Sequence, residues 1–373
     1  MPRKAKSLRV PGPVEIAAVL LVCFGIVLIF KKQYADGLVA QCALRHERGD
    51  FSEALELCEQ ALAIYLQLND ATKLIPGVKD GLLWADVAQT TDNIGVVNMN
   101  IGNSVVALQY HEQALRMRTS KLGFEHPDVA ATKDNMGLVY RQVNQLDKAL
   151  EMHNEALQIR LKTLNPRDLA VCATKTAIAN VYYQREEYLL AMMLYDEVLQ
   201  AQEEALGEDH VEVATTLQNL GAVLKHSNTT ASLERYERSL AILVGMYGHK
   251  HRGVADTLNS MGGVRFVEGR WDDAMQAYQQ SLDITVSLLG ASHPDVAATL
   301  SNMGAVLDHL NRTDEARDYY RQAGDIWQMA GMEWAPDVSK GAEASDAEKN
   351  VLHSTATEQP SGTEIGNLDE DDA

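Results

Sequence analysis

Apolar and polar residues follow a helical period over most of the chain, and one phrase of that pattern recurs. HPDVAATKDNMG begins at His126, and HPDVAATLSNMG begins at His293. Related phrases begin at Asp168, His210 and His251, so successive register marks are 42, 42, 41 and 42 residues apart. Near-equal steps of this length are the signature of an array of structural repeats.

Each period predicts two amphipathic helices joined by a short polar turn. In the copy that begins at His126, a Pro-Asp pair suits the first turn of a helix. Val129, Met136 and Val139 then fall on one apolar stripe. A polar turn at 144–147 precedes a second helix, and an earlier copy begins at Trp84. The pattern therefore predicts an all-α chain of about seven helical hairpins.

Small residues recur at fixed places in both helices. A glycine inside a helix costs about 1 kcal/mol relative to alanine, so its recurrence predicts a close approach between the two helices of a hairpin. The first-helix positions are Gly95, Gly137, Ala179, Gly221, Gly262 and Gly304. The second helix carries alanines at Ala54, Ala107, Ala149, Ala191, Ala274 and Ala316, and small residues seven positions later at Ala61, Ala114, Ala156, Ser239, Ser281 and Ala323.

This spacing of small and aromatic residues resembles the tetratricopeptide repeat. The 42-residue period and the HPDVA wording are similar to the repeat domain of kinesin light chains. The resemblance covers residues 84–330 well and residues 31–68 less well. It implies a right-handed superhelical solenoid whose first helices line a concave face. Kinesin light chains have a heptad coiled coil before their repeats, and this chain has an apolar run there, so direct motor binding is not expected.

The concave face is expected to hold an extended peptide or a partner protein. One position carries an amide repeatedly, at Asn93, Asn135, Asn219 and Asn302. A carboxamide offers a donor and an acceptor to any peptide unit. Ala177 and Ser260 interrupt the series. The alternative is that these asparagines are solvated or hydrogen-bond a neighbouring helix.

Basic residues on the first helices could favour an acidic peptide. They are Lys133, Arg141, Lys175 and Lys225, and a solvated surface is the alternative interpretation. Tetratricopeptide domains that bind the C-terminal carboxylates of chaperones use lysine and arginine at fixed positions. Here these positions hold Asp92, Asp134, Thr176 and Gln218, so that mode of binding is disfavoured.

The N-terminal region predicts a membrane anchor. A basic flank at 1–13 precedes a largely apolar run at 14–32, which is near the minimum length that spans a bilayer. A cleaved signal peptide and a buried core helix are the alternatives. The prediction is a transmembrane signal anchor at 14–32 in a single-pass membrane protein, with the organelle and the orientation left open.

The remaining segments are expected to be a first degenerate hairpin at 33–68, a linker at 69–80, six repeats at 81–330 and a disordered acidic tail at 331–373. The tail has eleven acidic and two basic residues, about half of the formal net charge of -19. This charge excludes a general nucleic-acid binder. The four cysteines show no metal spacing; Cys42 and Cys58 could face each other across one hairpin, but the sequence does not establish a disulfide.

Catalysis is not expected. The register histidines lie one repeat apart, too far to share a metal ion, and their position marks the start of a helix. No phosphate-binding loop and no hydrolase or zinc-protease motif occurs, so we expect no cofactor and no small-molecule substrate. The sequence predicts a membrane-anchored interaction scaffold. Alternatives are a soluble or secreted adaptor or assembly factor with a cleaved N-terminus, and a cargo adaptor like kinesin light chain.

Overall fold

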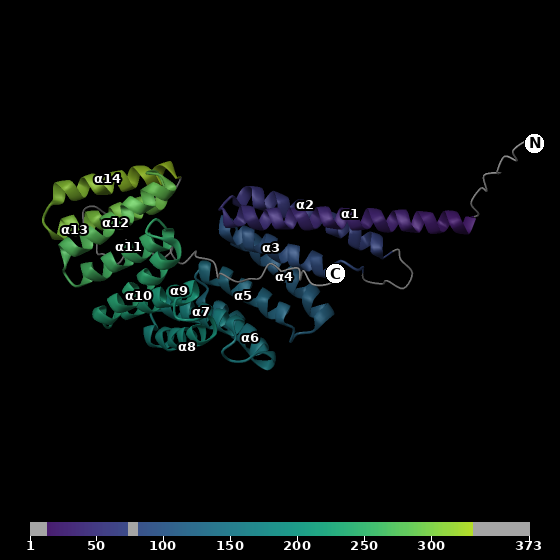
Figure 1. Cartoon of the computed structure of the whole chain (residues 1–373), viewed down its shortest axis with the longest axis horizontal. Coiled ribbons are helices and arrows are strands. Elements are labelled where there is room, and N and C mark those ends of the chain that lie inside the picture. Colours follow the sequence, from purple (N-terminus) through teal and green to yellow (C-terminus); the bar gives the residue numbers. More distant parts are fainter. Residues whose placement is uncertain (1–12, 74–80, 331–373) are drawn as a thin grey trace, which may run out of the picture. The chain divides into compact units, whose positions relative to one another are not determined.

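The chain folds into helices joined by short turns. The computed structural model describes residues 13–73 and 81–330, with side chains from Gly25 onward (Figure 1). These residues form fourteen α-helices. They divide into two compact units, which we call the N-terminal unit (up to Lys162) and the C-terminal unit (from Thr163). The prediction of an all-helical array of seven hairpins is confirmed.

The N-terminal unit contains three hairpins. In each hairpin we call the first helix A and the second helix B. The helices are α1 (Pro13–Glu47), α2 (Phe51–Thr72), α3 (Trp84–Ile101), α4 (Ser104–Leu122), α5 (Pro127–Gln142) and α6 (Leu146–Thr163), whose last residue lies just past the boundary. Helix α2 packs on α3, α4 packs on α5, and the A helices α3 and α5 also touch.

The C-terminal unit contains four hairpins. Its helices are α7 (Leu169–Gln184), α8 (Tyr188–Leu206), α9 (Val211–Leu224), α10 (Thr229–Tyr247), α11 (Arg252–Val267), α12 (Trp271–Leu289), α13 (Pro294–His309) and α14 (Thr313–Met329). Every helix packs on the next one along the chain, and the A helices α11 and α13 touch directly. Stacking therefore buries an apolar core that runs from hairpin to hairpin.

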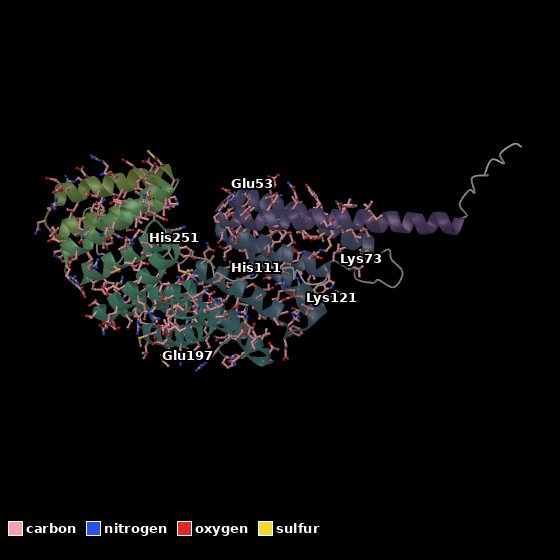
Figure 2. The ribbon with its side chains drawn as sticks, viewed as in Figure 1. Glu53, Lys73, His111, Lys121, Glu197 and His251 are labelled. Atoms are coloured by element: carbon pink, nitrogen blue, oxygen red, sulfur yellow. A yellow bond between two sulfur atoms is a disulfide. The ribbon has the colours of Figure 1, made fainter. Side chains whose placement is uncertain are left out.

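The register histidines are N-caps, as their place before Pro-Asp or Val predicts. The Nδ1 atom of His126 accepts a hydrogen bond from the backbone N–H of Asp128 at 3.1 Å. His210, His251 and His293 accept from the backbone two residues onward in the same way (His251 is labelled in Figure 2). Asp168 performs this role with its carboxylate in α7. Each side chain satisfies a backbone donor that the first helical turn leaves without a partner.

The recurrent glycines mark close contacts between helix A and helix B, as predicted. A Cβ atom on Gly95 would lie 2.6 Å from the ring of His111, and one on Gly137 would lie 2.6 Å from the ring of His153. Gly262 makes the same contact with a tyrosine ring of its own hairpin. A side chain at these positions would collide with a rigid ring, which explains why the helices tolerate glycine there.

The predicted transmembrane helix is contradicted. Among the helices whose side chains are described, none combines the length and apolar content needed to cross a bilayer. Part of the apolar run, residues 14–24, lies before the first described side chain. Helix α1 does not stop after Lys32 but continues to Glu47, and its C-terminal part is helix A of the first hairpin. Lys32 forms ion pairs with Asp36 and Asp86 there. The predictions of a signal anchor and of a single-pass membrane location are therefore wrong.

Other predicted segments lie outside the described residues. These are most of the basic flank, residues 74–80 of the linker, and the acidic tail at 331–373.

Candidate peptide-binding face

The asparagine series lies on the A helices, and two of its members bond to the preceding A helix. Asn135 on α5 donates to the carboxylate of Asp92 on α3 at 3.2 Å. Asn302 on α13 donates to the side-chain oxygen of Asn259 on α11, also at 3.2 Å. The two bonds are equivalent to each other, since each runs from an asparagine of the series to the residue one position before the series in the preceding repeat. The amides are therefore held in fixed orientations by the stacking of the hairpins.

The other two asparagines differ from this arrangement. Asn93 accepts a hydrogen bond from Gln89, one turn earlier on α3, at 2.9 Å. Asn219 on α9 is half-buried and makes no side-chain hydrogen bond within the described part of the chain. The four amides thus share a place in the repeat but have different partners.

Each of the predicted basic residues has its own surroundings. Lys133 pairs with Glu155 on helix B of its own hairpin, and Lys175 pairs with Glu197 at 2.9 Å in the equivalent way (Glu197 is labelled in Figure 2). Arg141 lies in the last turn of α5, where a positive charge suits the helix dipole. Lys225 is the C-cap of α9. The two lysines therefore neutralise helix B carboxylates.

A buried charged cluster lies beside the asparagine series in the second hairpin. The Asp92 carboxylate accepts from the ring Nδ1 atom of His111 at 2.6 Å and from the guanidinium of Arg118 at 2.9 Å. All three side chains are nearly inaccessible to solvent (His111 is labelled in Figure 2). Arg118 also donates to the hydroxyl of Thr132 on the next A helix. The cluster therefore ties α3, α4 and α5 together.

The Asp92 carboxyl is held in its charged form. Burial by itself would raise its pKa, but the hydrogen bond and charge of His111 and the charge of Arg118 outweigh burial and lower the pKa. Removing one partner of such a buried pair strongly lowers the stability of the folded chain, because the carboxylate would stay buried without a compensating charge.

The same cluster recurs one period later. Asp134 accepts from His153 at 2.8 Å and from Arg160 at 2.5 Å. In the C-terminal unit, tyrosines take the place of the histidine, at Tyr195, Tyr236, Tyr278 and Tyr320. Thr176, Gln218, Asn259 and Ser301 take the place of the aspartate.

The sequence matches family profiles of the tetratricopeptide repeat, in agreement with the stacked helical hairpins. A profile described as tetratricopeptide repeat matches residues 86–162, 170–243 and 253–328, which is more than half of the chain. The chain belongs to the tetratricopeptide repeat family. A second tetratricopeptide profile matches residues 43–71 in the first hairpin. The predicted family is thereby confirmed. No curated protein matches the chain.

Three solved structures illustrate what this chain is similar to in fold. The apo form of RapI is 13% identical and has a TM-score of 0.55, covering 79% of this chain and 98% of its own. The Rap conjugation gene regulator of plasmid pLS20, solved with the Phr* peptide, is 14% identical and has a TM-score of 0.55. The match covers 78% of this chain and 73% of the regulator. Kinesin light chain repeats from Podosopora anserina are 19% identical with a TM-score of 0.47. The match covers 55% of this chain and 98% of that chain.

Sequence reasoning about the tetratricopeptide face missed the aspartate–histidine–arginine clusters. Their signal was available, because Asp92, His111 and Arg118 recur one period later as Asp134, His153 and Arg160. In the sequence, Asp92 and Asp134 stand out only as positions where chaperone-binding domains have a lysine or an arginine. Their partners lie on helix B, so their pairing needs the hairpin geometry.

Proposed function

We propose that the A-helix face of each unit of this tetratricopeptide array is a protein-interaction surface, and that its asparagines bind an extended peptide. Repeat arrays of this kind provide extended concave binding surfaces. The fold relatives are consistent with this use, since the pLS20 regulator was solved in complex with a peptide. The proposed role is that of a scaffold or adaptor without catalysis.

The hydrogen bonds between adjacent A helices are the observation that carries the proposal. Asn135 uses one amide N–H on Asp92, which leaves its carbonyl oxygen and second N–H to a ligand. Asn302 is fixed by Asn259 through the same kind of bond, but it is buried where Asn135 is half-buried. A side chain that is already oriented loses little conformational entropy when it binds, so these contacts favour affinity. Because a carboxamide reads the peptide backbone, we expect broad tolerance of ligand side chains.

Asn219 provides the cleanest test. Peptides would be selected from a random-sequence display library on the immobilised full chain, and their affinities measured by fluorescence polarisation. Asn219→Ala removes no side-chain hydrogen bond within the described part of the chain. A lower peptide affinity would therefore report the loss of a direct contact between Asn219 and the peptide. A buried peptide hydrogen bond is worth about 0.5–1.5 kcal/mol, so we expect a loss of about 2- to 10-fold.

Asn154→Ala is the matched control, because Asn154 is exposed on helix B of the third hairpin. It should leave peptide affinity unchanged. If Asn219→Ala and Asn302→Ala bind every selected peptide as tightly as the wild type does, the asparagine face is not the binding site.

A further inference from the structure

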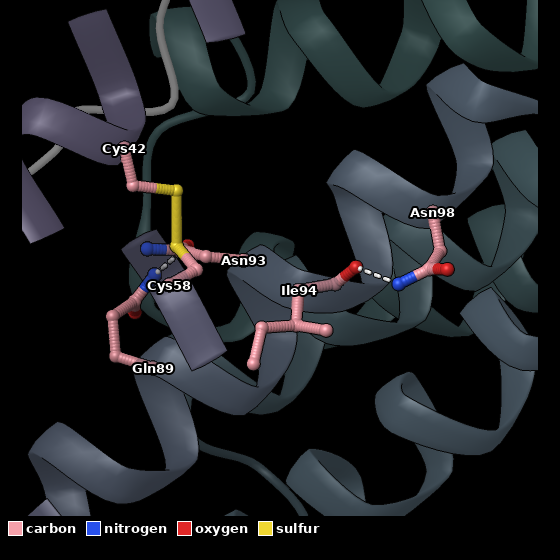
Figure 3. Close-up of a disulfide and its surroundings, with 6 residues drawn as sticks. All are labelled: Cys42, Cys58, Gln89, Asn93, Ile94 and Asn98. Carbon is pink, nitrogen blue, oxygen red and sulfur yellow. Dashed lines mark hydrogen bonds between the residues drawn. A yellow bond between two sulfur atoms is a disulfide. The ribbon is translucent and has the colours of Figure 1, made fainter. Parts of the chain in front are cut away.

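The first hairpin differs from the others at the contact between its two helices. A disulfide joins Cys42 on α1 to Cys58 on α2, with the two Cα atoms 5.6 Å apart (Figure 3). The cysteines are sixteen residues apart. Gly95 and His111 have the same separation, and so do Gly262 and Tyr278. The disulfide therefore occupies the place that a glycine and an aromatic ring occupy in later hairpins.

This equivalence holds for the surroundings of the cysteines as well. Ala54 and Ala61 flank Cys58 on helix B, as Ala107 and Ala114 flank His111, and all four alanines are fully buried. Both sulfur-bearing residues are also buried, and they pack with Ile94 and Val97 of α3. Figure 3 shows the side chain of Ile94 near the bond. The disulfide thus lies where the first hairpin meets the second.

We propose that this disulfide is a redox-sensitive latch that docks the first hairpin onto the array. Without the disulfide, the first hairpin would have neither the glycine nor the ring that joins helix A to helix B in later hairpins. Two thiol sulfurs cannot stay at bonding distance, so reduction forces them apart in the buried space between α1, α2 and α3, which costs packing energy. The covalent bond replaces that contact and also removes conformational freedom from the unfolded loop.

Contacts at the other end of the hairpin do not depend on the disulfide. The hydroxyl of Tyr65 donates to Asp36 at 2.5 Å, and Lys32 pairs with Asp86 of α3. Reduction should therefore loosen the hairpin near the α1–α2 turn, where His46 contacts Phe51, and leave the opposite end more protected. The latch acts locally, on the first repeat.

The chemistry needs an oxidant of the disulfide class, such as oxidised glutathione. One cysteine thiolate attacks a glutathione sulfur, which forms a mixed disulfide and releases one glutathione thiolate. The second cysteine, after losing its proton, attacks the cysteine sulfur of that mixed disulfide and releases the second glutathione. Two protein thiols are oxidised and one glutathione disulfide is reduced. Such bonds persist where the surroundings are oxidising.

Hydrogen exchange of the full chain, read by mass spectrometry, tests the latch. The chain is equilibrated either with oxidised glutathione or with a phosphine reductant. We expect amides of residues 40–60 to exchange about 100-fold faster after reduction, which is the factor expected from opening a loop of this size. Residues 163–330 should be unaffected. Unchanged exchange at 40–60, or two alkylatable thiols at Cys42 and Cys58 after oxidation, would overturn the proposal.

Three variants make the test specific. Cys42→Ala with Cys58→Ala should resemble the reduced chain under both conditions. Cys172→Ser changes a buried cysteine that is not in a disulfide, and it should keep the wild-type response. Cys42→Gly with Cys58→Tyr installs the contact that Gly262 and Tyr278 make. That variant should be protected and insensitive to the reductant; if it exchanges like the double alanine variant, the equivalence of the two contacts is wrong.

Discussion

The second and third hairpins of the N-terminal unit and the last two hairpins of the C-terminal unit solve the same packing problem with different side chains. In α3–α4 a histidine ring covers Gly95, and a buried aspartate and arginine surround that ring. In α11–α12 a tyrosine ring covers Gly262, and the positions of the charged partners hold Asn259 and Thr285.

This difference shows that the ring has two separable roles: it fills space above the glycine, and in α3–α4 it also takes part in a charged network. Both rings fill the space above a glycine, so helix A and helix B approach equally closely in both units. In α3–α4 the ring belongs to a buried network of charged groups, and that network must be complete because its members lie out of water. The hairpin α3–α4 is therefore expected to depend on charge at a contact where α11–α12 does not.

Removing the buried cation should have the largest effect. Arg118→Met leaves Asp92 charged and buried beside His111, and we expect a loss of about 3–5 kcal/mol in the free energy of unfolding. Urea denaturation of the full chain measures the loss, and hydrogen exchange should locate it in α3–α5. Arg116→Met is the control, since the Arg116 side chain is 71% exposed on the same helix. Equal effects from both substitutions would contradict a special role for the buried cluster.

Filling the glycine positions should destabilise both units to a similar, smaller extent. Gly95→Ala and Gly262→Ala each place a Cβ atom 2.6 Å from a ring, so we expect each to cost about 1–3 kcal/mol. Thermal melts and urea titrations provide the values.

Gly245→Ala is the control for this pair. Gly245 lies in α10, and a Cβ atom there would meet nothing within 4 Å. The substitution should stabilise the chain by about 0.5–1 kcal/mol, because alanine is the better helix former. If Gly95→Ala and Gly262→Ala also stabilise, the close approach is not what selects glycine.

Acid should remove the advantage that the Asp92 charge provides. The pKa of this carboxyl is lowered in the folded chain, so its contribution is present above the unfolded value of about 3.9 and is lost as the pH falls through the folded pKa. The difference in the free energy of unfolding between the wild type and Asp92→Asn, measured by urea denaturation, should therefore narrow below about pH 4. A protonated carboxyl keeps some hydrogen bonds, so the change is smaller than that of Arg118→Met. A gap that stays constant down to pH 2 would show that the charge contributes nothing.

The smallest effect is expected where the two units are alike. Lys133 and Lys175 each pair with a helix B glutamate of their own hairpin, and the glutamates are 43% and 57% exposed. Pairs that are open to water contribute about 0–1 kcal/mol, so Lys133→Met and Lys175→Met should each change the free energy of unfolding by less than about 1 kcal/mol. A larger loss from only one of them would reveal a difference between the units that the glycine contacts do not show.

The sequence by itself determined the repeat, its period and the two helices of each hairpin. These features are local, because a helical pattern, a cap such as His126 and a mid-helix glycine are all visible along the chain. The asparagine series and the small residues of helix B were visible for the same reason. The apolar run near the N-terminus was misjudged, because hydropathy alone did not show that α1 continues into the first hairpin.

Only the tertiary structure decided which side chains meet. Cys42 and Cys58 lie on different helices, as do Asp92, His111 and Arg118, and a pattern along one helix does not identify partners on another. The disulfide, the buried charges and the lysine–glutamate pairs depend on how closely the helices of a hairpin approach. In α3–α4 and α11–α12 that distance is set by packing a ring against a glycine, a contact in space between residues sixteen positions apart.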